Sequence, residues 1–155
     1  MQSEPVSRRD LLRAGLCLFS CHMLSACGGN GSEPTLPGLE FADDAATVRG
    51  STVEIDVSRV PQWRNAPAAE TAVVFLAAQV IVVRRTASSF TALSAVCPHA
   101  GCGVSRVQTN ALVCPCHDST FTFNGERVSG PAPTGLASLP VRFEQRDGRL
   151  FVDLR

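Results

Sequence analysis

The sequence predicts an all-β protein, an antiparallel sandwich or barrel into which a small subdomain is inserted. Short segments alternate apolar and polar residues, as in 52–57 (TVEIDV), and this alternation is typical of half-buried strands. The dipeptides Asn124-Gly125 and Asp147-Gly148 lie between such segments and indicate hairpin turns. A chain of 155 residues with a net charge of +0 is long enough for one core and gives no electrostatic indication of nucleic-acid binding.

The expected strands occupy 52–57, two parts of 71–83, 90–96, 104–107, 111–113, 120–123, 139–144 and 149–154. The apolar run 71–83 (TAVVFLAAQVIVV) is compatible with one buried helix, but its β-branched residues and the polar Gln79 favour two core strands. Segment 60–69 contains two prolines and is predicted to be an irregular connection. Segments 139–144 and 149–154 are expected to form a closing hairpin.

The first 26 residues are predicted to be an export signal. Residues 7–13 (SRRDLLR) resemble the twin-arginine signal, and the apolar run 14–26 is too short to cross a bilayer, which needs about 20 residues. Residues 24–28 (LSACG) resemble the lipobox of bacterial lipoproteins. That resemblance implies that Cys27 is lipidated and becomes the mature N-terminus. The alternative is an uncleaved N-terminal anchor.

The predicted domain order follows from this signal. Residues 27–44 begin with a stretch rich in Gly, Pro and polar residues and are expected to form a flexible tether. Residues 45–155 form the folded domain. The mature protein is therefore expected to be lipid-anchored on the extracytoplasmic side of a bacterial membrane.

Two short boxes contain the candidate site. They are 97–102 (CPHAGC) and 114–121 (CPCHDSTF). Each offers one thiolate and one imidazole, Cys97 with His99 and Cys114 with His117. Four of the seven cysteines lie in these boxes, and cysteines that only pack in a core would not be concentrated in this way. Cysteine and histidine in such sets bind an iron–sulfur cluster or zinc.

The spacing favours the cluster. Zinc sites commonly show two cysteines in one knuckle and two histidines in the other, whereas each box here mixes the two residue types. Zinc also leaves Cys102 and Cys116 without a role. A zinc-binding structural module stays open as the less favoured alternative.

The two boxes together are similar to the Rieske iron–sulfur family, and the likeness extends over roughly 90–141. It implies one [2Fe–2S] cluster per chain, held by both thiolates on one iron and both imidazoles on the other, in a cluster-binding part of about 92–135. It implies a disulfide between Cys102 and Cys116, which respiratory and arsenite-oxidase-type members carry. It also implies the family's all-β fold, with a base built from both ends of the chain.

Neighbouring residues are expected to tune the cluster. Ser119 matches a serine that hydrogen-bonds a cluster sulfide, and Gly130-Pro131-Ala132-Pro133 matches the family's proline loop. Phe121 stands where quinol-oxidising members have Tyr, Asp118 replaces Gly, and Ala100 replaces a bulkier residue. Phe121 lacks the hydroxyl of that tyrosine, and Asp118 adds a negative charge. Both differences predict a redox potential below that of quinol-oxidising subunits.

The resemblance implies one-electron transfer by a subunit of an oxidoreductase rather than by a complete enzyme. The expected role is that of a quinol–cytochrome c reductase-like iron–sulfur subunit or a stand-alone carrier, with a cytochrome b or c type partner and possible contact with quinol. The alternative is the small subunit of a periplasmic oxidoreductase such as arsenite oxidase, with a molybdenum subunit as partner.

Overall fold

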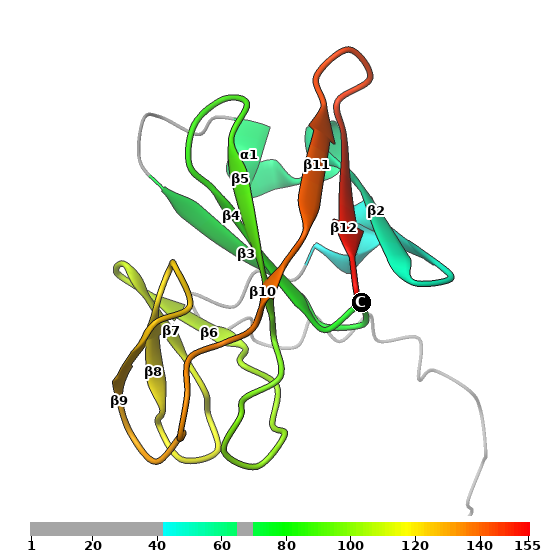
Figure 1. Cartoon of the computed structure of the whole chain (residues 1–155). Coiled ribbons are helices and arrows are strands. Elements are labelled where there is room, and N and C mark those ends of the chain that lie inside the picture. The colour runs from blue at the N-terminus through cyan, green and yellow to red at the C-terminus, as the bar shows by residue number, and fades with distance from the viewer. Residues whose placement is uncertain (1–41, 65–69) are drawn as a thin grey trace, which may run out of the picture. The chain divides into compact units, whose positions relative to one another are not determined.

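The computed structural model describes residues 42–64 and 70–155 (Figure 1). All of them belong to one unit, Pro34–Arg155. The predicted signal peptide, Cys27 and the tether as far as residue 41 lie outside the described residues. Within the described ranges, no helix has the length and hydropathy needed to cross a membrane.

Three antiparallel four-stranded sheets make up the described fold and confirm the predicted all-β class. The first has the order β1 (Ala46–Arg49), β2 (Thr52–Asp56), β12 (Arg149–Asp153) and β11 (Val141–Glu144). The second has the order β10 (Ser138–Leu139), β5 (Phe90–Ser94), β4 (Val80–Arg84) and β3 (Thr71–Phe75). The third has the order β6 (Arg106–Gln108), β7 (Ala111–Val113), β8 (Thr120–Thr122) and β9 (Arg127–Ser129).

The connectivity separates a base from an inserted subdomain. Strand β2 pairs with β12, so the base combines strands from both ends of the described chain, as predicted. The third sheet follows β5 and precedes β10, which pairs with β5. Strands β6 to β9 therefore form an insertion between two neighbouring strands of the base, and Figure 1 shows them as a separate group.

The second sheet is buried on both faces. Val80 and Val82 of β4 belong to a core shared with the first sheet, whereas Ile81 and Val83 belong to a second core shared with the third sheet. All four are 0% exposed. A strand covered on both faces needs apolar residues at every position, which explains the continuous apolar run. The predicted break is also present, because Gln79 takes a left-handed φ of 54° in the turn before β4.

Several predicted boundaries were wrong in detail. Leu139 does not begin the closing hairpin but lies in β10, and Pro140 separates β10 from β11. The 3₁₀ helix η3 (Val57–Arg59) follows β2, and the predicted irregular connection 60–69 begins with the one-turn helix α1 (Pro61–Arg64). Residues 65–69 of that connection lie outside the described residues. Proline is favoured at the first position of a helix because that residue needs no N–H donor.

Helix α1 is held by its aromatic residue. Trp63 is 2% exposed and packs against Phe75 and Phe90, with ring centroids 6.1 and 5.5 Å away. Phe90 in turn packs against Phe143 at 4.9 Å. Burial of this tryptophan in the first core fixes a helix too short to be stable alone.

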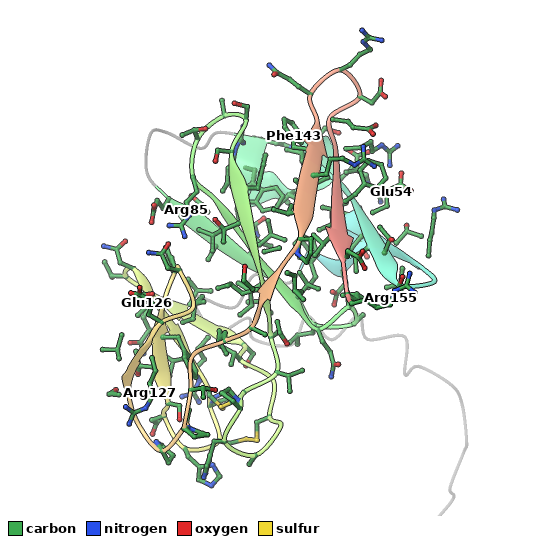
Figure 2. All side chains as sticks on the ribbon, in the orientation of Figure 1. Glu54, Arg85, Glu126, Arg127, Phe143 and Arg155 are labelled. Carbon is green, nitrogen blue, oxygen red and sulfur yellow. A yellow bond between two sulfur atoms is a disulfide. The ribbon has the colours of Figure 1, made fainter. Side chains whose placement is uncertain are left out.

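Arg85 joins the base to the subdomain. Its guanidinium forms an ion pair with Glu70 at 2.6 Å and donates a hydrogen bond to Thr91 Oγ1 at 3.2 Å. It also donates to the Phe123 carbonyl at 2.9 Å and to Asn124 Oδ1 at 2.6 Å, in the turn after β8. The Arg85 side chain, labelled in Figure 2, therefore connects that turn to the end of β4 in the second sheet.

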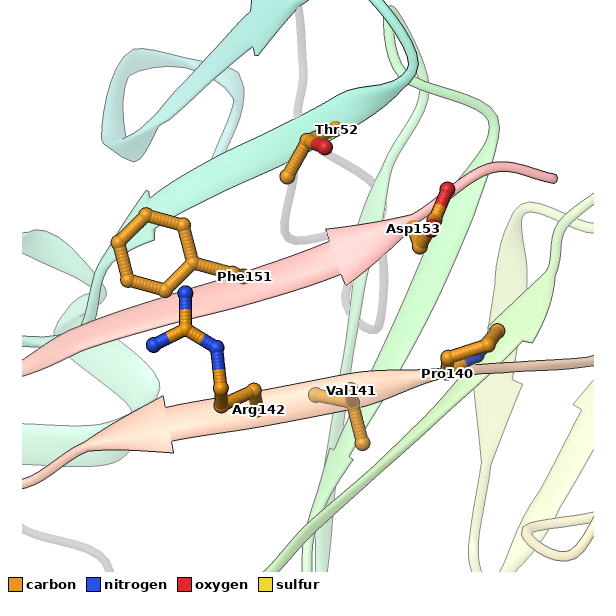
Figure 3. A pocket seen from close by; sticks show the side chains of 6 residues that line it. All are labelled: Thr52, Pro140, Val141, Arg142, Phe151 and Asp153. Atoms are coloured by element: carbon orange, nitrogen blue, oxygen red, sulfur yellow. The ribbon is translucent and has the colours of Figure 1, made fainter.

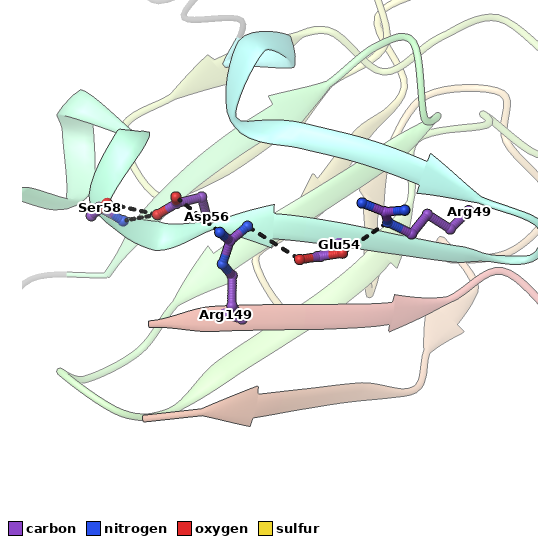
Figure 4. Close-up of polar contacts among 5 residues, drawn as sticks. All are labelled: Arg49, Glu54, Asp56, Ser58 and Arg149. Atoms are coloured by element: carbon purple, nitrogen blue, oxygen red, sulfur yellow. Dashed lines mark hydrogen bonds and ion pairs between the residues drawn. The ribbon is translucent and has the colours of Figure 1, made fainter. Parts of the chain in front are cut away.

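The outward face of the first sheet carries a row of paired charges (Figure 4). Arg149 contacts Glu54 at 3.1 Å and Asp56 at 3.8 Å, and Glu54 also pairs with Arg49 at 3.0 Å. Asp56 Oδ1 accepts hydrogen bonds from Ser58 Oγ at 2.6 Å and Ser58 N at 3.1 Å. The Ser58 hydroxyl, with help from Arg149, holds the pKa of Asp56 below its usual value.

We expect Asp56→Asn to weaken the fold in a pH-dependent way. Because the folded-state pKa of Asp56 is lowered, its contribution is fully present above the unfolded-state pKa and fades as the pH falls through the folded-state value. Urea unfolding near pH 7 should show a loss of about 0.5 to 1 kcal/mol, a modest value because the pair is partly exposed. The loss should shrink in acid. An equal loss at all pH values, or the same loss in the control Asp147→Asn, would contradict this assignment.

Candidate functional site

The two boxes form loops at one end of the subdomain, and each loop is closed by its own backbone. In the first, Cys97 N donates to the Cys102 carbonyl at 2.8 Å, and Gly101 N donates to the Cys97 carbonyl at 2.9 Å. In the second, Cys114 N donates to the Ser119 carbonyl at 2.9 Å. Strands β5 and β7 lead into these loops. The protein backbone therefore sets the shape of both loops.

The thiols point inward and the imidazoles lie outward. Cys97 and Cys114 are free cysteines, 1% and 2% exposed, and belong to the second core. His99 and His117 are exposed, and their ring centroids lie 4.6 Å apart at an interplanar angle of 85°. The structure thus places the two thiols next to each other in the core and the two imidazoles next to each other at the surface.

The two buried thiols interact directly. Burial raises the pKa of the Cys114 thiol, and the neighbouring Cys97 raises it further. The backbone N–H groups of Cys116 and His117 act in the opposite direction, because they donate hydrogen bonds to the sulfur. A buried pair of sulfur ligands is disfavoured as two bare thiolates, and a bound cation removes that cost.

The predicted disulfide is confirmed. Cys102 and Cys116 are bonded, with their Cα atoms 6.5 Å apart, and Figure 2 shows the bond in yellow. The Sγ atom of Cys114 lies within 4.8 Å of both bonded sulfur atoms. This group of three sulfurs is not itself the ligand set, since two of them are already bonded to each other. The disulfide links the two loops, which is the role that the resemblance implied.

The proline loop is attached to the second box through Ser119. Ser119 is 0% exposed, and its Oγ accepts a hydrogen bond from Ala132 N at 3.1 Å. Gly130 has a φ of +87°, and a Cβ atom on it would lie 2.5 Å from the Ser119 Cα. Only glycine allows the loop to approach this closely.

The other tuning residues differ in exposure. Phe121 is 0% exposed in the second core, opposite Leu112 in the neighbouring strand. Pro131 is exposed. Asp118 adopts a left-handed φ of 54°, its side chain is 81% exposed, and its carboxylate lies 3.9 Å from Arg106. That backbone conformation favours glycine, which accounts for the glycine expected at this position from the resemblance.

A groove on the first sheet is not part of this site. It has a volume of about 300 Å³ and is lined by Thr52, Pro140, Val141, Arg142, Phe151 and Asp153 (Figure 3). The Arg142 guanidinium is already engaged, since it pairs with Glu144 and stacks over the Phe151 ring at 4.5 Å. None of the groove residues belongs to either box.

Sequence reasoning missed the contacts that hold the loops in place. It did not find that Ala132 N–H binds Ser119, that Arg85 clamps the subdomain, or that Gly135 packs against the Gly125 carbonyl, where a Cβ would lie 2.4 Å away. The glycines in these turns were visible in the sequence. Which backbone each one approaches depends on tertiary structure.

Comparison with known proteins agrees with this geometry. The family model of the Rieske [2Fe-2S] domain matches residues 55–140, more than half of the chain. The chain therefore belongs to the Rieske [2Fe-2S] domain family. This membership makes the domain a carrier of a [2Fe–2S] cluster and implies electron transfer.

Similar proteins include subunits of several redox complexes. A cytochrome b6-f complex iron-sulfur subunit of Chlorobaculum tepidum is 39% identical over 75 residues, 48% of this chain and 40% of that protein. The cytochrome bc1 complex Rieske iron-sulfur subunit of Corynebacterium efficiens is 41% identical over 66 residues, 40% of this chain and 16% of that protein. A candidate respiratory nitrate reductase subunit of Rieske type from Haloferax mediterranei is 45% identical over 56 residues, 35% of this chain and 26% of that protein. The matches span less than half of each relative.

Among solved structures, the plasma membrane Rieske protein PetC3 from Synechocystis PCC 6803 is 25% identical with a TM-score of 0.43. The match covers 54% of this chain and 85% of that chain.

The residues present fit a [2Fe–2S] cluster of the Rieske type. Two buried thiols face each other, two imidazoles sit together at the surface, and the remaining two cysteines of the loops are bonded to each other. This leaves a donor set of two sulfurs and two ring nitrogens, which is the set that such clusters require.

We expect Gly130→Ala to displace the proline loop. The new Cβ would overlap the Ser119 backbone, and the positive φ would add strain, so the free energy of unfolding should fall by about 2 to 4 kcal/mol. The matched control is Gly148→Ala, which has a φ of +63° but nothing within 4 Å of its Cβ. The control should lose only about 1 to 2 kcal/mol in urea unfolding. Equal losses in the two variants would show that the close approach to Ser119 is unimportant.

Proposed function

We propose that Cys97, His99, Cys114 and His117 hold the [2Fe–2S] cluster and that the protein transfers single electrons through it. The observation that carries the proposal is the division of the site into two buried thiols and two exposed imidazoles on loops fixed by their own hydrogen bonds. The thiolates would hold one iron and the imidazoles the other, as the resemblance implies. When bound, the cluster accepts and returns one electron.

The surrounding residues would influence the redox potential of the cluster. Neutral imidazoles donate less charge than thiolates, so this donor set supports a higher potential than the roughly −400 mV of an all-cysteine cluster. The amide N–H groups of Cys116 and His117, which point at the Cys114 sulfur, act in the same direction. Asp118 opposes it with an exposed negative charge. We propose a potential below that of quinol-oxidising members of the family.

The exposed histidines also give the site access to protons. Both side chains are exposed, so the proposed ligand set would leave the ring nitrogen that does not bind iron close to solvent. Such a nitrogen can exchange a proton with water or accept a hydrogen bond from a quinol. Phe121 is buried and has no hydroxyl, and Ala100 is small, so the protein's own residues give a quinol little support.

The proposed partner is a cytochrome b or c type component of a membrane complex, or the protein is a stand-alone carrier. Support comes from the relatives in cytochrome b6-f and bc1 complexes. A second candidate is the small subunit of a periplasmic oxidoreductase of the arsenite-oxidase kind. The similarity to the nitrate reductase subunit supports this second candidate, because that relative belongs by its name to a reductase and not to a cytochrome complex.

We further propose that the protein is exported with its cluster and tethered by lipid on Cys27. The supporting residues are the twin-arginine sequence 7–13 and the lipobox-like 24–28. A disulfide at Cys102 and Cys116 suits an oxidising compartment.

Substitution of single ligands tests the assignment. Cys97→Ser, His99→Ala, Cys114→Ser and His117→Ala should each abolish the Rieske-type EPR signal and lower the iron and sulfide content. Cys102→Ser is the control, because it removes the disulfide but no proposed ligand, and it should assemble a less stable cluster. A ligand variant that keeps the full signal would exclude that residue. A colourless wild-type protein with one zinc per chain would support the zinc module instead.

Asp118→Asn tests the role of the exposed charge. Asparagine tolerates the left-handed φ, so mainly the charge changes. We expect the midpoint potential to rise by roughly 20 mV, the effect of one exposed charge at about 8 Å from the redox centre in water. Asp147→Asn, in the turn between β11 and β12 at the opposite end of the unit in Figure 1, should leave it unchanged. Equal shifts in both variants would argue against a local effect of Asp118.

Two variants test export and anchoring. Replacement of Arg8 and Arg9 by lysine should keep the protein in the cytoplasm, as judged by cell fractionation. Cys27→Ser should be exported without lipid, so that metabolic labelling with a fatty acid fails, whereas the control Cys21→Ser should be labelled. Labelling of the Cys27→Ser protein would contradict the lipid anchor.

A further inference from the structure

Three sulfur atoms of the two loops are close neighbours. The Sγ atoms of Cys102, Cys114 and Cys116 all lie within 4.8 Å of one another, and those of Cys102 and Cys116 form a disulfide. The third belongs to Cys114, which is a free thiol. A thiolate can attack one sulfur of a disulfide and displace the other. The fold therefore places a buried thiol beside this disulfide, and the exchange requires that thiol to lose its proton first.

This arrangement is held by the protein itself. The hydrogen bonds from Cys97 N to the Cys102 carbonyl and from Cys114 N to the Ser119 carbonyl close the two loops through backbone atoms alone. Cys114 is 2% exposed and packs in the second core with Leu112 and Phe121. A reaction between groups fixed side by side is faster than the same reaction with a thiol from solution.

We propose that, in the chain without bound cluster, Cys114 exchanges with the Cys102–Cys116 disulfide to form a Cys102–Cys114 bond and release Cys116. The Cys114 thiol gives its proton to water and its sulfur bonds to Cys102. The Cys102–Cys116 bond breaks, and Cys116 leaves as a thiolate that takes up a proton. One disulfide is exchanged for another, so no oxidant or reductant is needed.

Attack on Cys102 rather than Cys116 follows from the chain. A bond between Cys114 and Cys116 would close a small ring across Pro115, whose fixed φ limits the geometry that a disulfide requires. A bond between Cys114 and Cys102 joins the two loops, as the original bond does. The leaving sulfur also favours this direction, because Cys116 is exposed and its thiolate is hydrated, whereas Cys102 is half-buried.

The consequence for assembly rests on the proposed ligand set. A chain with a Cys102–Cys114 bond has lost one of its four ligands and cannot take up the cluster. Conversely, a cluster bound to Cys114 occupies the attacking sulfur and protects the disulfide. We infer that the cluster must enter before the loop disulfide forms, or while it is reduced.

The test traps the released thiol. The full chain, with Cys17, Cys21 and Cys27 replaced by serine, is prepared metal-free with its disulfide intact and treated with N-ethylmaleimide under native conditions. Proteolysis and mass spectrometry then map the disulfides and labels. We expect a Cys102–Cys114 disulfide with the label on Cys116. Cys97 is 1% exposed, so a label there marks unfolded chains, which are excluded.

Two variants sharpen the result. Cys114→Ser should leave Cys116 unlabelled, because the nucleophile is missing. Cys97→Ser is the matched control, because Cys97 is also a proposed ligand but its sulfur is not one of the three neighbouring sulfur atoms. This variant should still be labelled on Cys116. An intact Cys102–Cys116 bond in the folded chain, with the label on Cys114 or nowhere, would overturn the proposal.

The cluster-loaded chain provides the second comparison. It should keep the Cys102–Cys116 bond and remain unlabelled under the same conditions, and labelling at the rate of the metal-free chain would overturn the protective effect. Failure of the proposed ligand set is recognised separately, because a freshly reduced chain would then take up no cluster. The disulfide map of the metal-free chain does not depend on that outcome.

Discussion

Burial of the second sheet on both of its faces is the constraint on which the structure depends. Val80 and Val82 pack toward the first sheet, and Ile81 and Val83 pack toward the subdomain. The short strands β6 to β9 could not bury enough apolar surface alone, since a small sheet needs a second layer to be stable. The base therefore supplies that layer, and Cys97 and Cys114 join the same core as Leu93 and Phe121. The two thiols are thus held by a core that the base and the subdomain share.

This placement gives the site its two sides. The thiols lie in an apolar interior, and the imidazoles lie at the surface, where the proposed function has electrons and protons enter and leave. The disulfide and the Ser119–Ala132 hydrogen bond connect the loops around that division. The same packing places Cys114 beside the disulfide, which is the basis of the proposed exchange.

The sequence predicted the all-β class, the Rieske domain and the disulfide, whereas the four ligand residues stay a prediction. Local signals were sufficient where chemistry is local: the two boxes predicted the loops, Gln79 marked the break in the apolar run, and Asn124-Gly125 marked a hairpin. They failed where pairing decides the structure. Strand β1 is mostly exposed and forms because it pairs with β2, and Leu139 joins β5 rather than the closing hairpin. Contacts made by Arg85 and Gly130 join residues distant in sequence, and no local pattern specifies them.

The most direct measurement is a redox titration of the purified full chain, followed by EPR and repeated over a range of pH. We predict a Rieske-type signal with a midpoint within about −150 to +300 mV, the range of clusters with two imidazole ligands. The midpoint should decrease at high pH, because the proposed imidazole ligands would let a proton leave together with the electron. A midpoint near −400 mV that does not depend on pH would indicate an all-cysteine cluster and contradict the account. An iron-loaded protein without the signal would contradict it as well.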